Sequence, residues 1–506
     1  MQTSYMEVTA KPRSIKRNSI ANIVNRTWTT LANFLFVPVY IHYLGEEAYG
    51  LVTFFTTLQV VLNLFGLGLS KTLRREFSVY ESSEAVVLRK YRILRSVELI
   101  IWCIAIIIIG ICALNADYIA TKWINSETIA ESTVSLTIRM MGVSIAAQLI
   151  ANLYLGCLLG MQDQILANTL QISWSLFKNI GAVLLIVFVS SNISYFYIWH
   201  AVIDIIYLVT VRIFVIAKLK KKKSDLSWKL HDLANLKTIY KFALGILLIS
   251  VGYAINSQID KIIITKNFDL VSVGAYNSVY SLSILTTILT SSIGIAVFPR
   301  FTQLFTGNDL SGLNKTFRSY NSIAVLTTSV IGGFLAIFAE ELLLFWTRSE
   351  IITNIMAGVS FWLILGTALS AIQEIPYNYF LARGCTIVNN IQTIIQIAYV
   401  LTVTPFMIRY YGLSGAALSW FIEMALSTTI YLIVFSRMYL DKCSLRLLIS
   451  IYLPLLISIA IAFCARTLML AIDFTDYQRL LGAILIGALT LGIAFIISNK
   501  HKFSNL

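Results

Sequence analysis

The chain has 506 residues, of which 58% are hydrophobic and only 13% are charged, and its mean hydropathy is +0.78. A soluble protein needs more charge than this on its surface, so the composition excludes that class and predicts an all-α polytopic membrane protein. The net charge of +14 does not indicate a nucleic-acid partner, because 28 of the 39 Lys and Arg residues lie in the N-terminus and in alternate predicted connections. This is the positive-inside pattern, and it predicts that both termini are cytoplasmic.

About fourteen apolar runs, each of roughly 18 to 25 residues, are long enough to cross a hydrocarbon core of about 30 Å as helices. They are expected near residues 19–43, 48–70, 94–114, 134–158, 166–189, 195–217, 242–265, 273–297, 322–346, 355–375, 386–408, 413–436, 447–467 and 480–498.

The first run is unusually polar, with Asn18, Asn22, Asn25, Thr29 and Asn33 at helical spacing. These side chains therefore share one helix face. An unpaired polar group in hydrocarbon costs several kcal/mol, so this face is expected to turn towards protein or water inside the membrane.

The chain also contains an internal repeat. A shift of 221 residues lays Gln171 over Gln392, a shift of 219 lays Asp204 over Glu423, and a shift of 227 lays AYG (48–50) over AYN. The similar offsets predict a six-helix unit written twice in the same orientation, with a site at the midplane between the two copies.

The predicted domains follow from this repeat. They are an N-terminal lobe (1–217, spans 1–6), a basic cytoplasmic linker (218–241), a C-terminal lobe (242–440, spans 7–12), and a C-terminal segment (441–506) with spans 13 and 14 and a cytoplasmic tail.

Basic residues inside the spans are the strongest candidates for function. An ionised group at depth costs about 2.5–3.5 kcal/mol and should face the protein interior or a cavity. Arg212 and Arg466 lie near span ends and are expected to reach the interface. Four basic residues are expected at greater depth: Arg26, Arg139, Lys178 and Lys261.

Acidic residues inside the spans allow two interpretations. Asp204 and Glu423 are related by the repeat, and Asp260 neighbours Lys261. These carboxylates either form structural ion pairs, for example Lys178 with Asp204, or bind and release a coupling ion, H⁺ or Na⁺. Neither a nucleotide-binding loop nor a catalytic or metal-binding motif is visible, so the sequence predicts neither an enzyme nor a resident cofactor.

The opening part of the sequence, residues 18–75, resembles a known protein family. The Asn-rich first span, Pro38, YLGEEAYG and the later GLGLSK resemble the O-antigen (Wzx-type) polysaccharide flippases of the multidrug/oligosaccharidyl-lipid/polysaccharide exporter superfamily, as does QIDKIIITKNFDLVSVGAYNSVY. The resemblance covers most of residues 15–440. It implies two six-helix lobes in a V around a cationic cavity, and alternating access that moves undecaprenyl-diphosphate-linked oligosaccharide to the outer leaflet of the bacterial cytoplasmic (inner) membrane.

The resemblance also implies roles and partners. The expected substrate-binding residues for diphosphate and sugar are Arg26, Arg139, Lys178, Lys261, Asn22, Asn25, Asn256, Gln171 and Gln392. The expected ion-coupling candidates are Asp204, Asp260 and Glu423. The expected partners are the lipid-linked oligosaccharide, membrane lipids, and a polysaccharide polymerase with its chain-length regulator.

Other functions stay open at this point. Spans 13 and 14 depart from the commoner twelve-span form and also occur in lipid II flippases, so a lipid II flippase is one alternative. A multidrug or toxin extruder is another, although buried Arg and Lys disfavour a carrier of cations. A membrane polysaccharide polymerase is less favoured, because no large extracytoplasmic loop is predicted.

Overall fold

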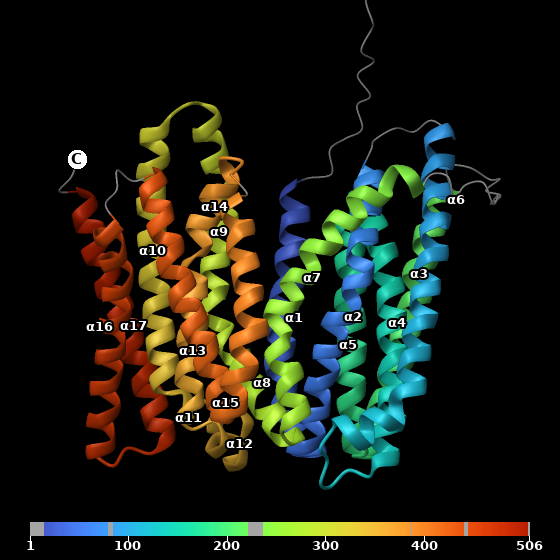
Figure 1. The fold of residues 1–506 in the computed structure, drawn as a ribbon, viewed down its shortest axis with the longest axis horizontal. Helices are drawn as coiled ribbons and strands as arrows, with labels where there is room; N and C mark the ends of the chain where they lie inside the picture. Colours follow the sequence, from blue (N-terminus) through green and yellow to red (C-terminus); the bar gives the residue numbers. More distant parts are fainter. Residues whose placement is uncertain (1–14, 79–83, 221–235, 386, 440–443, 504–506) are drawn as a thin grey trace, which may run out of the picture. The chain divides into compact units, whose positions relative to one another are not determined.

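The computed structural model describes residues 15–78, 84–220, 236–385, 387–439 and 444–503. Within these ranges the chain is almost entirely helical (Figure 1). The elements are α1 (Ile15–Leu44), α2 (Glu46–Ser78), α3 (Glu84–Tyr118), η1 (Ile119–Trp123, a π-helix), α4 (Glu131–Gly160), α5 (Gln164–Phe188), α6 (Ile193–Lys220), α7 (Leu236–Asn267), α8 (Leu270–Ser283), α9 (Leu285–Thr306), α10 (Leu310–Ile337), α11 (Ala339–Thr347), α12 (Glu350–Ile355), α13 (Val359–Ile372), α14 (Glu374–Ala382), α15 (Ile387–Tyr439), α16 (Ser444–Ala471) and α17 (Asp476–Phe503).

Nine segments within the described ranges are long and apolar enough to cross a membrane. A helix suits this task because it satisfies every backbone hydrogen bond within the segment. The chain is therefore an all-helical, multi-pass membrane protein, which confirms the class predicted from composition. Most of the predicted basic linker, residues 221–235, lies outside the described ranges.

Two helix boundaries are informative about the predicted spans. The run predicted at 322–346 is divided, because α10 ends at Ile337 and the short α11 follows. The runs predicted at 386–408 and 413–436 form α15, which breaks at Gly412. There φ is 61° and ψ is −140°, a conformation that glycine adopts without a Cβ penalty.

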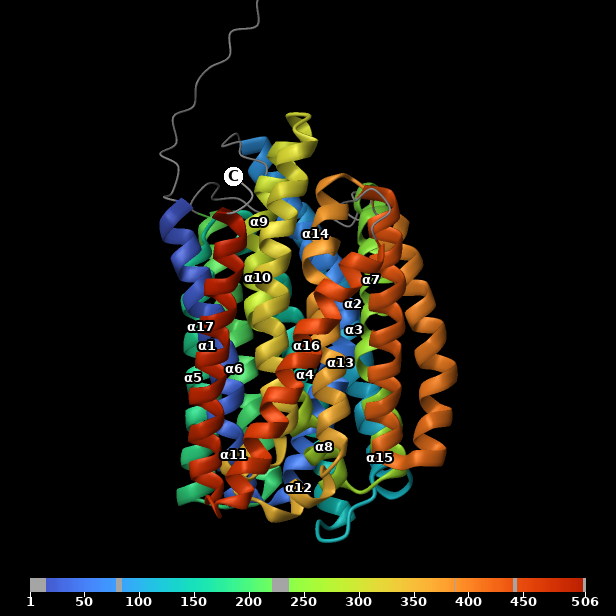
Figure 2. The ribbon, with the colours of Figure 1, turned by 90° about the vertical axis from the view of Figure 1, so that its left-hand side faces the viewer.

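The chain forms two compact units. Unit 1 contains Met1–Leu44, Leu58–Trp123 and Ile129–Val251, and unit 2 contains Gly45–Thr57, Ile124–Thr128 and Gly252–Leu506. In unit 1, α4 packs against α3, α5 and α6, and α1 packs along α5. In unit 2, α10 packs against α9, α13, α16 and α17, and Figure 2 shows α16 and α17 beside α10.

The first turns of α2 belong to unit 2, where they pack against α8. A Cβ atom at Gly50 would lie 1.8 Å from the carbonyl oxygen of Leu270, so only glycine allows this approach. Nearby, the Glu47 carboxylate accepts hydrogen bonds from the backbone N–H groups of Glu127 (2.6 Å) and Thr128 (2.9 Å). The AYG tripeptide that marked the repeat is therefore a close helix contact.

Candidate functional site

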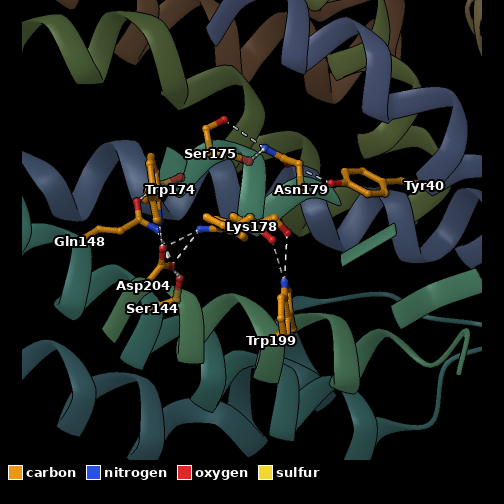
Figure 3. A network of polar contacts seen from close by, with 11 residues as sticks. Tyr40, Ser144, Gln148, Trp174, Ser175, Lys178, Asn179, Trp199 and Asp204 are labelled. Carbon is orange, nitrogen blue, oxygen red and sulfur yellow. Dashed lines mark hydrogen bonds and ion pairs between the residues drawn. The ribbon is translucent and has the colours of Figure 1, made fainter. Parts of the chain in front are cut away.

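A completely buried carboxylate, that of Asp204 on α6, lies in unit 1 (Figure 3). The Lys178 ammonium on α5 donates to its two oxygens at 2.9 and 3.2 Å. Trp174 Nε1 and Gln148 Nε2 donate to it at 2.7 Å each, and the Ser144 hydroxyl donates as well. Both oxygens therefore have donors, which is what a buried charge pair needs to be stable.

This network extends beyond the ion pair. The Gln148 side-chain oxygen accepts from Gln59 on α2, so the polar contacts join α2, α4, α5 and α6. Lys178 also lies 5.2 Å from the centre of the Trp174 ring, which stacks on Tyr207. The geometry thus brings Lys178 and Asp204 together as an ion pair, one of the two arrangements that the sequence left open.

The polar face of α1 meets α5. Asn22 donates to Gln164 at 2.7 Å, and Asn25 donates to Asn168 at 3.0 Å and to Gln171 at 2.7 Å. Asn168 donates back to Asn22 at 2.6 Å. These amides form a ladder between two helices, and interhelical hydrogen bonds of this kind hold membrane helices together.

Two further basic candidates, Arg26 and Arg139, lie in the first half of the chain. The Arg26 side chain lies outside the part of the chain that is described. Arg139, near the start of α4, forms an ion pair of 3.1 Å with Asp117, and the two side chains are 45% and 73% exposed. An exposed pair of this kind lies at a helix end and contributes little to stability.

Unit 2 holds a buried ammonium in a different setting. Lys261 on α7 is buried, and its nitrogen lies 3.6 Å from the centre of the Tyr280 ring, a cation–π contact. Within the described ranges no carboxylate makes an ion-pair contact with it. The adjacent Asp260 points elsewhere, because its Oδ2 accepts from the Tyr276 hydroxyl at 2.9 Å.

Several buried polar atoms on α7 and α15 have no hydrogen-bond partner among the described residues. They are Oδ1 of Asp260, Oδ1 of Asn256 and both carboxylate oxygens of Glu423. Because buried polar groups are nearly always satisfied, such a group calls for an explanation, and a bound ion or substrate is one.

The polar face of the first part of α15 is satisfied by the part of α15 that follows the break at Gly412 and by Gln373, which precedes α14. Gln392 donates to Ser427 at 2.7 Å and also to Gln373. Asn389 accepts from the Tyr431 hydroxyl at 2.6 Å. Gln392 therefore lies in a helix contact, like its repeat equivalent Gln171.

Two ion-pair clusters were missed from the sequence. Arg212, expected to reach the interface, instead contacts Tyr154 (3.0 Å) and the buried Glu98 (3.5 Å). Arg466, expected to do the same, binds the buried Glu341 at 2.7 Å. The acidic residues in other spans could have indicated these ion pairs. However, the partners are more than a hundred residues apart in the sequence, so their pairing could not be predicted.

Comparisons with known proteins identify the family and the fold. The family model described as polysaccharide biosynthesis protein matches residues 15–305. A Shigella flexneri protein named "Putative O-antigen transporter" is 21% identical over 427 residues, which cover 84% of this chain and 98% of that protein.

Two solved structures are similar in fold. One is the lipid II flippase MurJ in an inward closed conformation, with a TM-score of 0.71 and 17% sequence identity. The match covers 96% of this chain and 100% of the MurJ chain. The other is an inward-facing multidrug resistance MATE family transporter of the MOP superfamily, with a TM-score of 0.65 and 15% sequence identity. The match covers 81% of this chain and 94% of the transporter chain. The resemblance identified from the sequence is confirmed, and the names of these relatives describe transport rather than an enzyme activity.

Proposed function

The chain belongs to the polysaccharide biosynthesis protein family, and from this premise we propose that it is a flippase and not an enzyme. Its substrate is undecaprenyl-diphosphate-linked oligosaccharide, which it moves from the inner to the outer leaflet of the bacterial cytoplasmic membrane by alternating access. The observation that carries the proposal is the similarity to the Shigella flexneri protein named "Putative O-antigen transporter" over 98% of that relative's length. A polar path lets the headgroup cross without full loss of hydration, while the apolar tail stays in lipid.

The proposed architecture has about fourteen spans. Residues 1–217 and 242–440 form two six-helix lobes in a V, residues 441–506 add two helices, and both termini are cytoplasmic. Reporter fusions test this topology: a fusion in the basic linker at 218–241 should report a cytoplasmic location. A periplasmic location there would contradict the proposed orientation.

We propose that Lys261 contacts the substrate diphosphate, and Arg26, whose side chain lies outside the described part of the chain, is proposed from its position in the sequence alone. Lys178 and Arg139 already pair with Asp204 and Asp117, whereas the Lys261 ammonium contacts an aromatic ring and, among the described residues, no carboxylate. A buried cation of this kind gains most from an incoming phosphate.

We assign one sugar contact to Asn256, because its buried amide oxygen has no partner among the described residues and can accept from a sugar hydroxyl. The other amides expected to bind sugar already bond to protein, and in this proposal they position the helices. These amides are Asn22, Asn25, Gln171 and Gln392.

The coupling ion, H⁺ or Na⁺, is assigned to Asp260 and Glu423. Both carboxylates have buried oxygens that lack a hydrogen-bond donor or an ammonium among the described residues, which is costly, and binding a cation or proton removes that cost. Asp204 is less suited to this role, because its oxygens already accept from Lys178 and three other donors. A polymerase with its chain-length regulator would receive the translocated unit.

The function is tested with purified protein in proteoliposomes that carry a lipid-linked oligosaccharide labelled on its glycan. The expected result is transfer of the glycan to the opposite leaflet, faster than in protein-free vesicles, and little transfer by Lys261→Ala. A matched control is Lys266→Ala, an exposed lysine on the same helix. Transfer of lipid II or of a cationic drug, with no transfer of the oligosaccharide, would assign the chain to one of the alternative functions.

A further inference from the structure

A cavity of about 290 Å³ lies between α10 and α16 in unit 2. Its floor is apolar and contains the buried side chains of Phe317 and Val325. Its rim carries two exposed guanidinium groups, Arg318 from the third turn of α10 and Arg446 from the first turn of α16. None of the described residues that line it is a carboxylate.

Both arginines are available to a ligand. Within the described part of the chain, neither Arg318 nor Arg446 has a hydrogen-bond or ion-pair partner. Two guanidinium groups on neighbouring helices offer planar sets of N–H donors that match phosphate oxygens. The cavity is therefore built to attract a phosphate-sized anion.

A third group in the lining points to a ligand independently of charge. The Asn321 side chain is 5% exposed, and its Oδ1 is buried without a hydrogen-bond partner among the described residues. A buried amide that makes no protein contact usually bonds to water or a ligand. A hydroxyl-bearing headgroup would supply the missing donor.

The surroundings indicate that the anion belongs to a lipid. Both α10 and α16 are among the segments apolar enough to cross a membrane. Next to Arg446, the outer face of α16 exposes Leu445 (71%), Ile449 (50%) and Leu453 (49%). Acyl chains can lie along this apolar face while the phosphate lies between the arginines.

We propose that this cavity binds the phosphodiester headgroup of an anionic glycerophospholipid, which bridges α10 and α16. The site is separate from the substrate residues proposed on α7 and does not depend on the identity of the transported glycan. By the positive-inside pattern it lies at the cytoplasmic ends of the two helices.

The test uses purified full-length protein and native mass spectrometry to count bound lipids with added phosphatidylglycerol or phosphatidylethanolamine. Wild-type protein should retain phosphatidylglycerol preferentially. The double variant Arg318→Gln/Arg446→Gln should bind it about 25-fold more weakly, about fivefold for each arginine. Asn321→Leu should weaken binding with the charge unchanged. The control pair Arg300→Gln/Lys315→Gln removes equal charge from exposed residues outside the lining and should change binding less than twofold.

Three results would overturn the proposal. The first is equal retention of phosphatidylglycerol by the double variant and the control pair, with both monodisperse in gel filtration. The second is competition by inorganic phosphate at the same concentration as the lipid, which would assign the cavity to a free anion. The third is displacement by undecaprenyl phosphate at a lower concentration than phosphatidylglycerol, which would assign it to the transport substrate.

Discussion

The buried pair of Lys178 and Asp204 can be tested by removing each charge in turn. Asp204→Asn keeps the side-chain shape but leaves the Lys178 ammonium, whose side chain is 9% exposed, without its carboxylate. Lys178→Met keeps the length of the chain and leaves a carboxylate with no exposed surface. Each single variant therefore leaves a buried charge, whereas the double variant leaves none.

The expected magnitudes follow from this difference. Removing one partner of a buried ion pair costs about 3–5 kcal/mol, which corresponds to a fall in Tm of roughly 6 to 20 °C for a unit of this size. The double variant should lose less than the sum of the two single variants, by about 2 kcal/mol. The measurement is thermal unfolding of purified protein in detergent, followed by tryptophan fluorescence.

Arg139→Gln is the matched control, because it removes a charge from an exposed pair with Asp117. Such a pair contributes about 0–1 kcal/mol, so Tm should fall by less than about 4 °C. A fall for Asp204→Asn no larger than for this control would refute the structural role of the pair. If Lys178→Met instead abolished glycan transfer with an unchanged Tm, Lys178 would be a substrate residue.

The remaining predictions concern coupling and packing. Glu423→Gln should keep glycan transfer in proteoliposomes but remove its dependence on a pH or Na⁺ gradient; an unchanged dependence would exclude Glu423 as the coupling residue. Gly50→Val should destabilise the protein by at least about 1–3 kcal/mol in thermal unfolding, because its Cβ would overlap the Leu270 carbonyl. Gly110→Val, where nothing lies within 4 Å, should not. Glu341→Gln removes a partner of arginines on α16 and α17, and hydrogen exchange should rise in these helices.

The helices could be predicted well from the sequence because hydrophobicity is a local property. An apolar run of about twenty residues specifies a crossing helix whatever lies beside it. The polar face of the first run likewise predicted contact with protein or water, and Asn25 contacts Gln171 in the structure. The sequence did not identify α5 as the partner. A polar face indicates that a helix packs against polar groups, but it does not indicate which helix supplies them.

The ion pairs also differ in whether they could be predicted from the sequence. Lys178 and Asp204 lie 26 residues apart on consecutive helices, so a pairing between them could be named from the sequence. Arg466 and Glu341 are 125 residues apart, and the packing of α16 against α10, the helix before α11, brings them together. Without that packing, an arginine near a span end was more simply explained by reaching the interface.

The predicted repeat offers a comparison of the charged residues in the two halves of the chain. The shift of 221 residues that aligns the polar faces of α5 and α15 replaces Lys178 with Tyr399. The Tyr399 hydroxyl donates to the backbone carbonyl of Ser419 at 3.4 Å, so it does not replace the ammonium as a donor to Glu423. Where the first half has Lys178, the second half has Tyr399, and Glu423 is without a counter-charge among the described residues. A carboxylate in that state is costly to bury, and binding of a cation or proton would remove that cost, which is the physical reason for proposing Glu423 rather than Asp204 as an ion-coupling residue.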